Sequence, residues 1–245
     1  MAGNLPCHQG QRKQKKPMLH TWRSWTSAAL CLLLAGCAAG PMEQRSAIVL
    51  STALAAAREY GLADVRAQVP DVSIDLRYTT RQNVTGRPLY PRNMPCLLRP
   101  NTAARVKEAQ SILRAQGYGL RIWDAWRPPE VQELLYAHGG GTGMFLDPRT
   151  GWSRHCGGIS VDATLVDAQG RELRMPTYFD ENLSHAASDQ VPSDPEVRQN
   201  LAILHRAMRQ AGLIPLPTEW WHFDDVDFIK QPVLVIWGRD LGMRF

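Results

Sequence analysis

The stretch SRHCGGISVDAT, residues 153–164, places His155 seven positions before Asp162, with six residues between them that include Gly157 and Gly158. On one continuous strand, an odd offset would point these two side chains to opposite faces. The glycine pair allows a turn before the strand that carries Asp162, so both side chains can face one site. Histidine and aspartate are ordinary ligands of zinc. The stretch therefore predicts either two metal ligands or a polar turn followed by a surface aspartate.

A second segment, PTEWWHF at residues 217–223, places Glu219 three positions before His222 among large aromatic side chains. Metallohydrolases often need a histidine that holds the ion and a nearby carboxylate that takes a proton from water. The alternative is a strand with a surface glutamate and a histidine packed against tryptophan.

The third segment, WDAWRPPEVQ at residues 123–132, holds Arg127 between two tryptophans and two prolines. The prolines stiffen the backbone on one side of this arginine. An arginine held in this way can stabilise a developing oxyanion or bind a carboxylate through two hydrogen bonds. The alternative is an ordinary surface salt bridge.

Together, these segments resemble the zinc D-Ala-D-Ala dipeptidases of the VanX type, within the zinc D,D-peptidase and Hedgehog-like superfamily. The matching positions are Ser153-x-His155-x-x-Gly158-x-Ser160-x-Asp162, Glu219-Trp220-Trp221-His222 and Trp123-Asp124-Ala125-Trp126-Arg127-Pro128. DLRYTTRQNVTGRPLY (75–90) and MPTYFDE (175–181) match as well. The resemblance spans residues from about 70 to 225, in the order that the family has them.

The resemblance implies a role for seven residues. It implies three ligands for one Zn²⁺ ion per chain: His155, Asp162 and His222. Glu219 would be the general base that activates the zinc-bound water, and Arg127 would stabilise the tetrahedral intermediate. Asp180 would pair with the free ammonium of the substrate, and Ser153 would help to bind that same end. The implied reaction is hydrolysis of D-alanyl-D-alanine to free D-alanine.

Two positions need comment. Ser160 stands where the wider motif prefers alanine, and since a small side chain still fits, we expect little effect. Cys156 is next to His155 and could compete as a thiolate ligand, although adjacent residues rarely reach one ion. Cys96 and Cys156 either form a disulfide or remain two separate buried thiols.

The apolar periodicity predicts a single α+β domain, for which the resemblance implies a central, mainly antiparallel sheet flanked by helices, with the zinc site at the sheet. The predicted helices cover residues 42–61, 101–117, 128–137 and 194–210. The predicted strands cover residues 72–78, 120–126, 159–167, 171–175, 219–223 and 233–237.

The net charge of +5 comes from the N-terminal segment. Residues 1–36 hold five basic residues and no acidic one, so the remaining chain is near neutral. The high pI therefore gives no argument for nucleic-acid binding.

The same segment resembles a lipoprotein signal peptide. A basic stretch precedes the apolar run AALCLLLAG, which is short for a membrane-spanning helix, and Leu34-Ala35-Gly36-Cys37 resembles a lipobox. We expect residues 1–36 to be removed and residues 37–245 to form the exported dipeptidase-like domain. A lipid on Cys37 would hold it at the periplasmic side of a bacterial membrane, with the outer membrane as one candidate. The alternative is an uncleaved signal anchor or a buried helix.

Two other functions remain open at this point. One is a zinc D,D- or L,D-carboxypeptidase or endopeptidase that acts on peptidoglycan stem peptides. The other is a cell-wall-binding lipoprotein on an inactivated peptidase fold, although no ligand or base is missing here. The implied partner in the main interpretation is a small dipeptide.

Overall fold

The computed structural model describes residues 41–181 and 183–245. The helices are α1 (Pro41–Glu59), α2 (Val65–Gln68), α3 (Pro100–Arg114), α4 (Pro129–Gly139), α5 (Leu183–Ala186) and α6 (Pro195–Gln210). The strands are β1 (Ala63–Asp64), β2 (Ser73–Ile74), β3 (Leu97–Leu98), β4 (Tyr118–Asp124), β5 (Ser160–Asp167), β6 (Leu213–Leu216) and β7 (Glu219–Asp225).

The central sheet has five strands in the order β2-β4-β5-β7-β6. β2 runs parallel to β4, and the other neighbours pair antiparallel. β1 and β3 form a separate antiparallel pair. The predicted α+β class with a mainly antiparallel sheet is confirmed.

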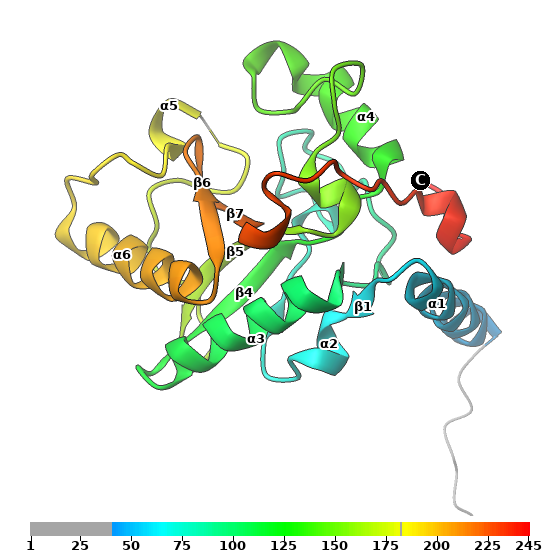
Figure 1. Cartoon of the computed structure of the whole chain (residues 1–245), viewed down its shortest axis with the longest axis horizontal. Helices are drawn as coiled ribbons and strands as arrows, with labels where there is room; N and C mark the ends of the chain where they lie inside the picture. The colour runs from blue at the N-terminus through cyan, green and yellow to red at the C-terminus, as the bar shows by residue number, and fades with distance from the viewer. Residues whose placement is uncertain (1–40, 182) are drawn as a thin grey trace, which may run out of the picture. The chain divides into compact units, whose positions relative to one another are not determined.

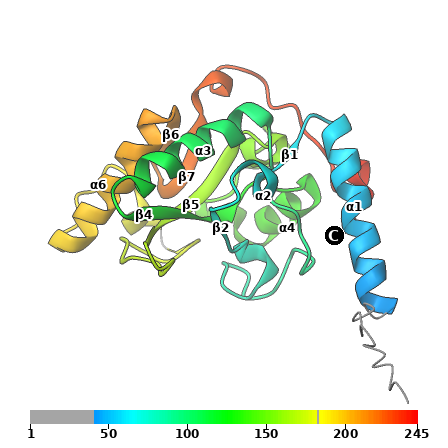
Figure 2. The ribbon, with the colours of Figure 1, turned by 90° about the horizontal axis from the view of Figure 1, so that it is seen from below.

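Helices α3 and α6 pack against each other and cover one face of this sheet (Figures 1 and 2). Helix α6 begins at Asp194, whose side chain accepts hydrogen bonds from the amides of Glu196 and Val197. His205 of α6 contacts the ring of Phe223 in β7, with ring centroids 5.6 Å apart. Because side chains alternate along a strand, the neighbours of Phe223 point away from α6, to the opposite face.

Two β-bulges interrupt the pairing next to this opposite face. In the β4–β5 pair the register shifts between Ile122 and Asp124, so that Asp124 lies opposite Asp162. In the β6–β7 pair it shifts between Pro215 and Leu216, so that Leu216 lies opposite Glu219. A bulge turns one side chain relative to the regular alternation. Both bulges therefore re-aim a carboxylate.

Several predicted elements differ from the observed ones. The strand predicted at 72–78 is limited to Ser73–Ile74 and is followed by a 3₁₀ turn at Arg77–Thr79. The prediction of strands at 171–175 and 233–237 is wrong: the first contributes one isolated bridge through Glu172, and the second forms no strand. Strand β6 was not predicted. Helix α3 begins one residue earlier than expected, with Pro100 in its first turn, and its N-terminus has no side-chain cap.

The predicted signal peptide and lipobox lie within residues 1–40, outside the described residues. In the described part of the chain, no helix combines the length and the apolar character needed to cross a membrane.

Candidate active site

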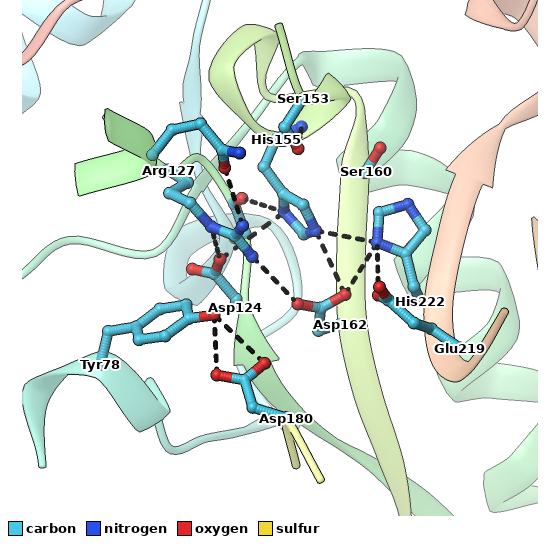
Figure 3. A network of polar contacts seen from close by, with 12 residues as sticks. Tyr78, Asp124, Arg127, Ser153, His155, Ser160, Asp162, Asp180, Glu219 and His222 are labelled. Atoms are coloured by element: carbon cyan, nitrogen blue, oxygen red, sulfur yellow. Dashed lines mark hydrogen bonds and ion pairs between the residues drawn. The ribbon is translucent and has the colours of Figure 1, made fainter. Parts of the chain in front are cut away.

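A cavity of about 370 Å³ opens beside the central strands. All seven residues for which the sequence predicts a role line this cavity: Arg127, Ser153, His155, Asp162, Asp180, Glu219 and His222. Polar neighbours and apolar side chains such as Phe145 and Trp152 complete the wall. Figure 3 shows the polar part of this arrangement.

Three of these residues form a compact group. His155 Nε2 lies 3.1 Å from Asp162 Oδ1 and 3.0 Å from His222 Nδ1, and His222 Nδ1 lies 3.0 Å from Asp162 Oδ1 (Figure 3). All three side chains are buried. Three potential ligand atoms of the right chemical types thus point at one small volume.

Local structure explains how these residues meet. The antiparallel pairing of β5 and β7 places Asp162 directly opposite His222. His155 comes from a 3₁₀ helix at Arg154–Gly157, which ends at Gly158 in the left-handed conformation, with φ of 69°. Glycine adopts this conformation without the steric cost that a side chain would add. The expected turn at the glycine pair therefore delivers His155 to the strand that carries Asp162.

The donor set fits a metal cation. The outer nitrogen of His155, Nδ1, lies 2.6 Å from the carbonyl of Ala125, which accepts its proton, and His222 Nε2 lies 3.0 Å from Asp224 Oδ1. With the outer nitrogens protonated, both inner nitrogens present lone pairs toward the Asp162 carboxylate. Three acceptor atoms at about 3 Å from one another need a positive charge among them.

The electrostatics of these three side chains agree with a cation site. Burial alone would lower the pKa of His222, but hydrogen bonds to Asp162 and Asp224 raise it well above its ordinary value. Burial opposes ionisation of Asp162, yet the two imidazoles hold the pKa of this carboxyl below its ordinary value. The group therefore attracts positive charge.

Glu219 lies beside the group. Its Oε2 is 4.0 Å from His222 Nδ1, although an offset of three residues would send the two side chains of a regular strand to opposite faces. The bulge in the β6–β7 pair removes this conflict. Burial raises the pKa of Glu219 above its ordinary value. The carboxylate of Glu219, with its raised pKa, thus faces the cavity next to the group formed by His155, Asp162 and His222.

Arg127 is held on several sides. Its Nε lies 2.8 Å from Asp124 Oδ2, Nη1 lies 3.0 Å from Gln132 Oε1, and Nη2 lies 3.5 Å from Asp162 Oδ2. Its guanidinium also stacks over the ring of Tyr78, 5.0 Å from the centroid. The arginine is buried, so the prediction of an ordinary surface salt bridge does not apply.

Asp180 lines the cavity. Tyr78 donates its hydroxyl proton to Oδ2 of Asp180 at 3.0 Å (Figure 3). Its φ of 57° is in the left-handed region, which few residues other than glycine adopt. Burial raises the pKa of Asp180 to about 7, and the charge of Arg127 opposes this shift. A strained backbone and a poorly solvated carboxyl at the edge of a cavity are typical of a binding site.

The sequence did not predict roles for Asp124, Gln132 and Tyr78. Asp124 anchors Arg127 and also accepts a hydrogen bond from Tyr90 at 2.8 Å. It stands three positions before Arg127, in a quoted motif, so its proximity could have been expected. Gln132 stands five positions after Arg127 in the same segment, whereas Tyr78 approaches only through tertiary packing.

The two cysteines among residues 41–245 that the structure describes are free. Cys96 and Cys156 are both buried and are not joined by a disulfide. Burial raises the pKa of the Cys156 thiol to about 12, which disfavours the thiolate that a metal would need. Cys156 is thus an inert neighbour of His155 in this structure.

Comparison with known proteins gives a consistent result. The family model described as D-Ala-D-Ala dipeptidase, of the M15 peptidases, matches residues 58–139 and 144–233. A D-alanyl-D-alanine dipeptidase of Escherichia coli K12 is 33% identical over 175 residues, which cover 71% of this chain and 89% of the relative. The D-alanyl-D-alanine dipeptidase of Enterococcus faecium is 27% identical over 186 residues, covering 67% and 91%. That of Enterococcus faecalis V583 is 26% identical over 190 residues, covering 69% and 93%.

The matched residues include every residue that lines the cavity except Gly143, and so include the buried His-Asp-His group and Glu219 beside it. M15 peptidases depend on a metal ion, and the described residues offer a group that could hold one. The chain belongs to the D-Ala-D-Ala dipeptidase family of M15 metallopeptidases.

Proposed function

We propose that this protein hydrolyses D-alanyl-D-alanine to two molecules of D-alanine in a zinc-dependent reaction. The observation that carries the proposal is one cavity that gathers a metal-binding group, a basic carboxylate and a second carboxylate about a dipeptide-sized space. The named activity of the relatives gives the substrate.

His155, Asp162 and His222 would hold the ion. When bound, zinc supplies Lewis-acid polarisation of the scissile carbonyl and of the attacking water. Three protein ligands leave a coordination position free, which is the usual arrangement of a catalytic zinc.

Glu219 acts as the general base. Its carboxylate takes a proton from the attacking water as the new C–O bond forms, and passes that proton to the departing nitrogen as the C–N bond breaks. The products are two free amino acids, and Glu219 returns to its ionised state. The bulge beside Leu216 is what brings this carboxylate to the metal-binding face.

Arg127 stabilises the negative charge that develops on the carbonyl oxygen. Its charge is permanent, and contacts with Asp124 and Gln132 fix its orientation before the substrate arrives. Such preorganisation costs no rearrangement during the reaction.

Asp180 binds the free ammonium of the dipeptide, and Ser153 helps at that end. A positive partner lowers the free-energy cost of ionising a buried carboxyl, and an ammonium group is such a partner. Because the α-ammonium lies one residue from the scissile bond only in a dipeptide, this contact selects free dipeptides over long stem peptides.

The test is a stereoisomer assay on the mature domain with zinc. D-Ala-D-Ala should be cleaved, and L-Ala-L-Ala should be cleaved far more slowly, with Glu219→Gln as the inactive control. If purified muropeptides lost their terminal residue while D-Ala-D-Ala stayed intact, the peptidoglycan carboxypeptidase interpretation would replace this one. Absence of any cleavage by zinc-loaded protein would refute the proposed activity.

We further propose that residues 1–36 direct export and that Cys37 carries a lipid. The support is the sequence alone: a basic stretch, a short apolar run and the lipobox-like tetrapeptide. Cys37→Ala should move the protein from the membrane fraction to the soluble periplasmic fraction. An unchanged membrane location for this variant would contradict the proposal.

A further inference from the structure

A second layer of polar contacts lies behind His222, on the side away from the ligand group. Asp224 Oδ1 lies 3.0 Å from His222 Nε2 and accepts a hydrogen bond from Ser160 Oγ at 2.5 Å. The other carboxylate oxygen of Asp224 lies 3.4 Å from Nε of Arg154. Ser160 is fully buried, and the Asp224 side chain is only 15% exposed.

The strand register builds this layer. In the β5–β7 pair, Asp162 lies opposite His222, and Ser160 lies opposite Asp224. The two pairs are two residues apart on both strands, so all four side chains share the face that points away from α6. The predicted ligand pair and the polar pair behind it are thus successive rungs of one ladder.

We propose that Asp224, held in place by Ser160, is a positioning residue for the metal-binding histidine His222. The Asp224 carboxylate accepts the Nε2 proton, which leaves the lone pair of Nδ1 directed at the ion. Ser160 donates its hydroxyl proton to the same oxygen and so fixes the rotation of the carboxylate. Ser160, where the resembled motif prefers alanine, therefore acts on the metal site through Asp224, contrary to the expectation of little effect.

The adjacent residue in β7 gives a matched control. Asp225 points to the opposite face, where it accepts a hydrogen bond from Thr102 at 2.8 Å and pairs with Arg105 at 2.9 Å. Asp225 is fully buried, and its contacts lie on the α3 side of the sheet. Asp225→Asn therefore removes a buried aspartate from the same strand without touching His222.

The inference rests on the proposed metal site but not on the substrate, so the test measures zinc binding alone. The dissociation constant for zinc would be measured by chelator competition on the full mature domain, with thermal unfolding of the metal-free proteins alongside. We expect Asp224→Asn to weaken zinc binding about 10–100-fold, the usual range for a partner of a ligating histidine. Ser160→Ala should weaken it by a smaller factor.

The combined variant shows whether Ser160 acts through Asp224. Its loss of affinity should be close to that of Asp224→Asn alone, because the serine no longer has a carboxylate to orient. Asp225→Asn should lower the unfolding temperature and leave zinc affinity unchanged.

Two results would overturn the proposal. One is an unchanged zinc affinity in Asp224→Asn. The other is an equal loss of affinity in Asp224→Asn and Asp225→Asn, which would mean that any damage to β7 has the same effect. Failure of the dipeptidase assay with normal zinc binding would instead count against the proposed function and leave this proposal intact.

Discussion

Glu219 and Asp180 are carboxylates that line the same cavity, and their surroundings separate their expected roles. Glu219 lies 4.0 Å from His222, whereas Asp180 accepts a hydrogen bond from Tyr78 on another side of the cavity. The first is placed to move a proton, and the second to hold a charge.

Substitution of Glu219 by Gln tests the first role. The change keeps the size of the side chain and removes its basicity, so kcat should fall by about 10²–10⁴-fold. Zinc content should stay at one ion per chain, because no ligand is removed. The measurements are steady-state kinetics and metal analysis on the same preparation. Full activity of the variant would assign the base elsewhere.

Substitution of Asp180 by Asn tests the electrostatic cost of the second role. The pKa of Asp180 is about 7 in the folded protein, against an ordinary value of 3.8. The folded state therefore binds this proton more tightly than the unfolded state, and wild-type stability declines as pH rises from about 4 to about 7. The decline from this group amounts to up to about 4 kcal/mol.

The Asn variant has no such ionisation. Its unfolding temperature, measured without metal, should match wild type near pH 4 and exceed it increasingly up to pH 7, above which the difference stays constant. Asn also tolerates the left-handed backbone at this position. A difference that does not change with pH would show that burial does not destabilise the ionised carboxyl.

The kcat/KM of the Asp180→Asn variant for the dipeptide should nevertheless fall at least about 30-fold, since the substrate ammonium loses its partner.

At the scale of elements, alternation along a strand proved a sound guide to burial and a poor guide to strand length. In the segment 72–78 the predicted apolar positions Leu76 and Tyr78 are buried. The strand nevertheless stops after Ile74, because β2 is an edge strand and the chain turns at Arg77 to bring Tyr78 to Asp180.

The strand predicted at 233–237 does not form, because the backbone of this segment has other hydrogen-bond partners. The amide of Ile236 donates to the carbonyl of Cys156, and the carbonyl of Ile236 accepts from the indole of Trp126. The backbone groups of Ile236 thus pair with a 3₁₀ helix and a tryptophan side chain in place of a neighbouring strand. Partners so distant along the chain leave no trace in local periodicity.

The candidate site was more predictable than the strands around it. Residue types and the glycine pair made His155, Asp162, Glu219 and His222 candidates, and the family resemblance favoured a metal site over a polar turn and a packed histidine. The bulges that aim Glu219 and Asp124 were not predictable, because a bulge depends on the register between two strands. The position of Asp224 could have been predicted, since on a strand it stands two positions after His222 and shares its face.

Substitution of Gly158 by Ala tests the turn that delivers His155. The left-handed backbone costs a side chain about 1–2 kcal/mol, and a Cβ here would meet Leu62 Cδ2 at 2.6 Å. Overpacking of this kind adds about 1–3 kcal/mol. We expect a clear fall in unfolding temperature together with weaker zinc binding.

Gly170→Ala is the matched control. Gly170 has φ of 78°, and a Cβ there would meet no atom within 4 Å. It should lose only the backbone contribution to stability and keep its zinc affinity. Equal losses in the two variants would mean that the packing around Gly158 has no special importance.

At the scale of the whole molecule, the metal should act as a fold stabiliser. A ligand at 100 times its dissociation constant stabilises the folded state by about 2.7 kcal/mol, if the unfolded chain does not bind it. For a domain of this size that corresponds to about 5–10 °C in unfolding temperature. Differential scanning calorimetry with and without a chelator measures it. His222→Ala should show no such difference, and a shift of the same size in that variant would place the ion elsewhere.

The pairing of β5 with β7 is also needed to complete the candidate site. His155 and His222 are 67 positions apart, and the group closes only when β7, near the end of the chain, has paired with β5. A segment that ends before β7 contains His155 and Asp162 but neither Glu219 nor His222. The complete group therefore forms only in the folded chain, as a result of the β5–β7 pairing.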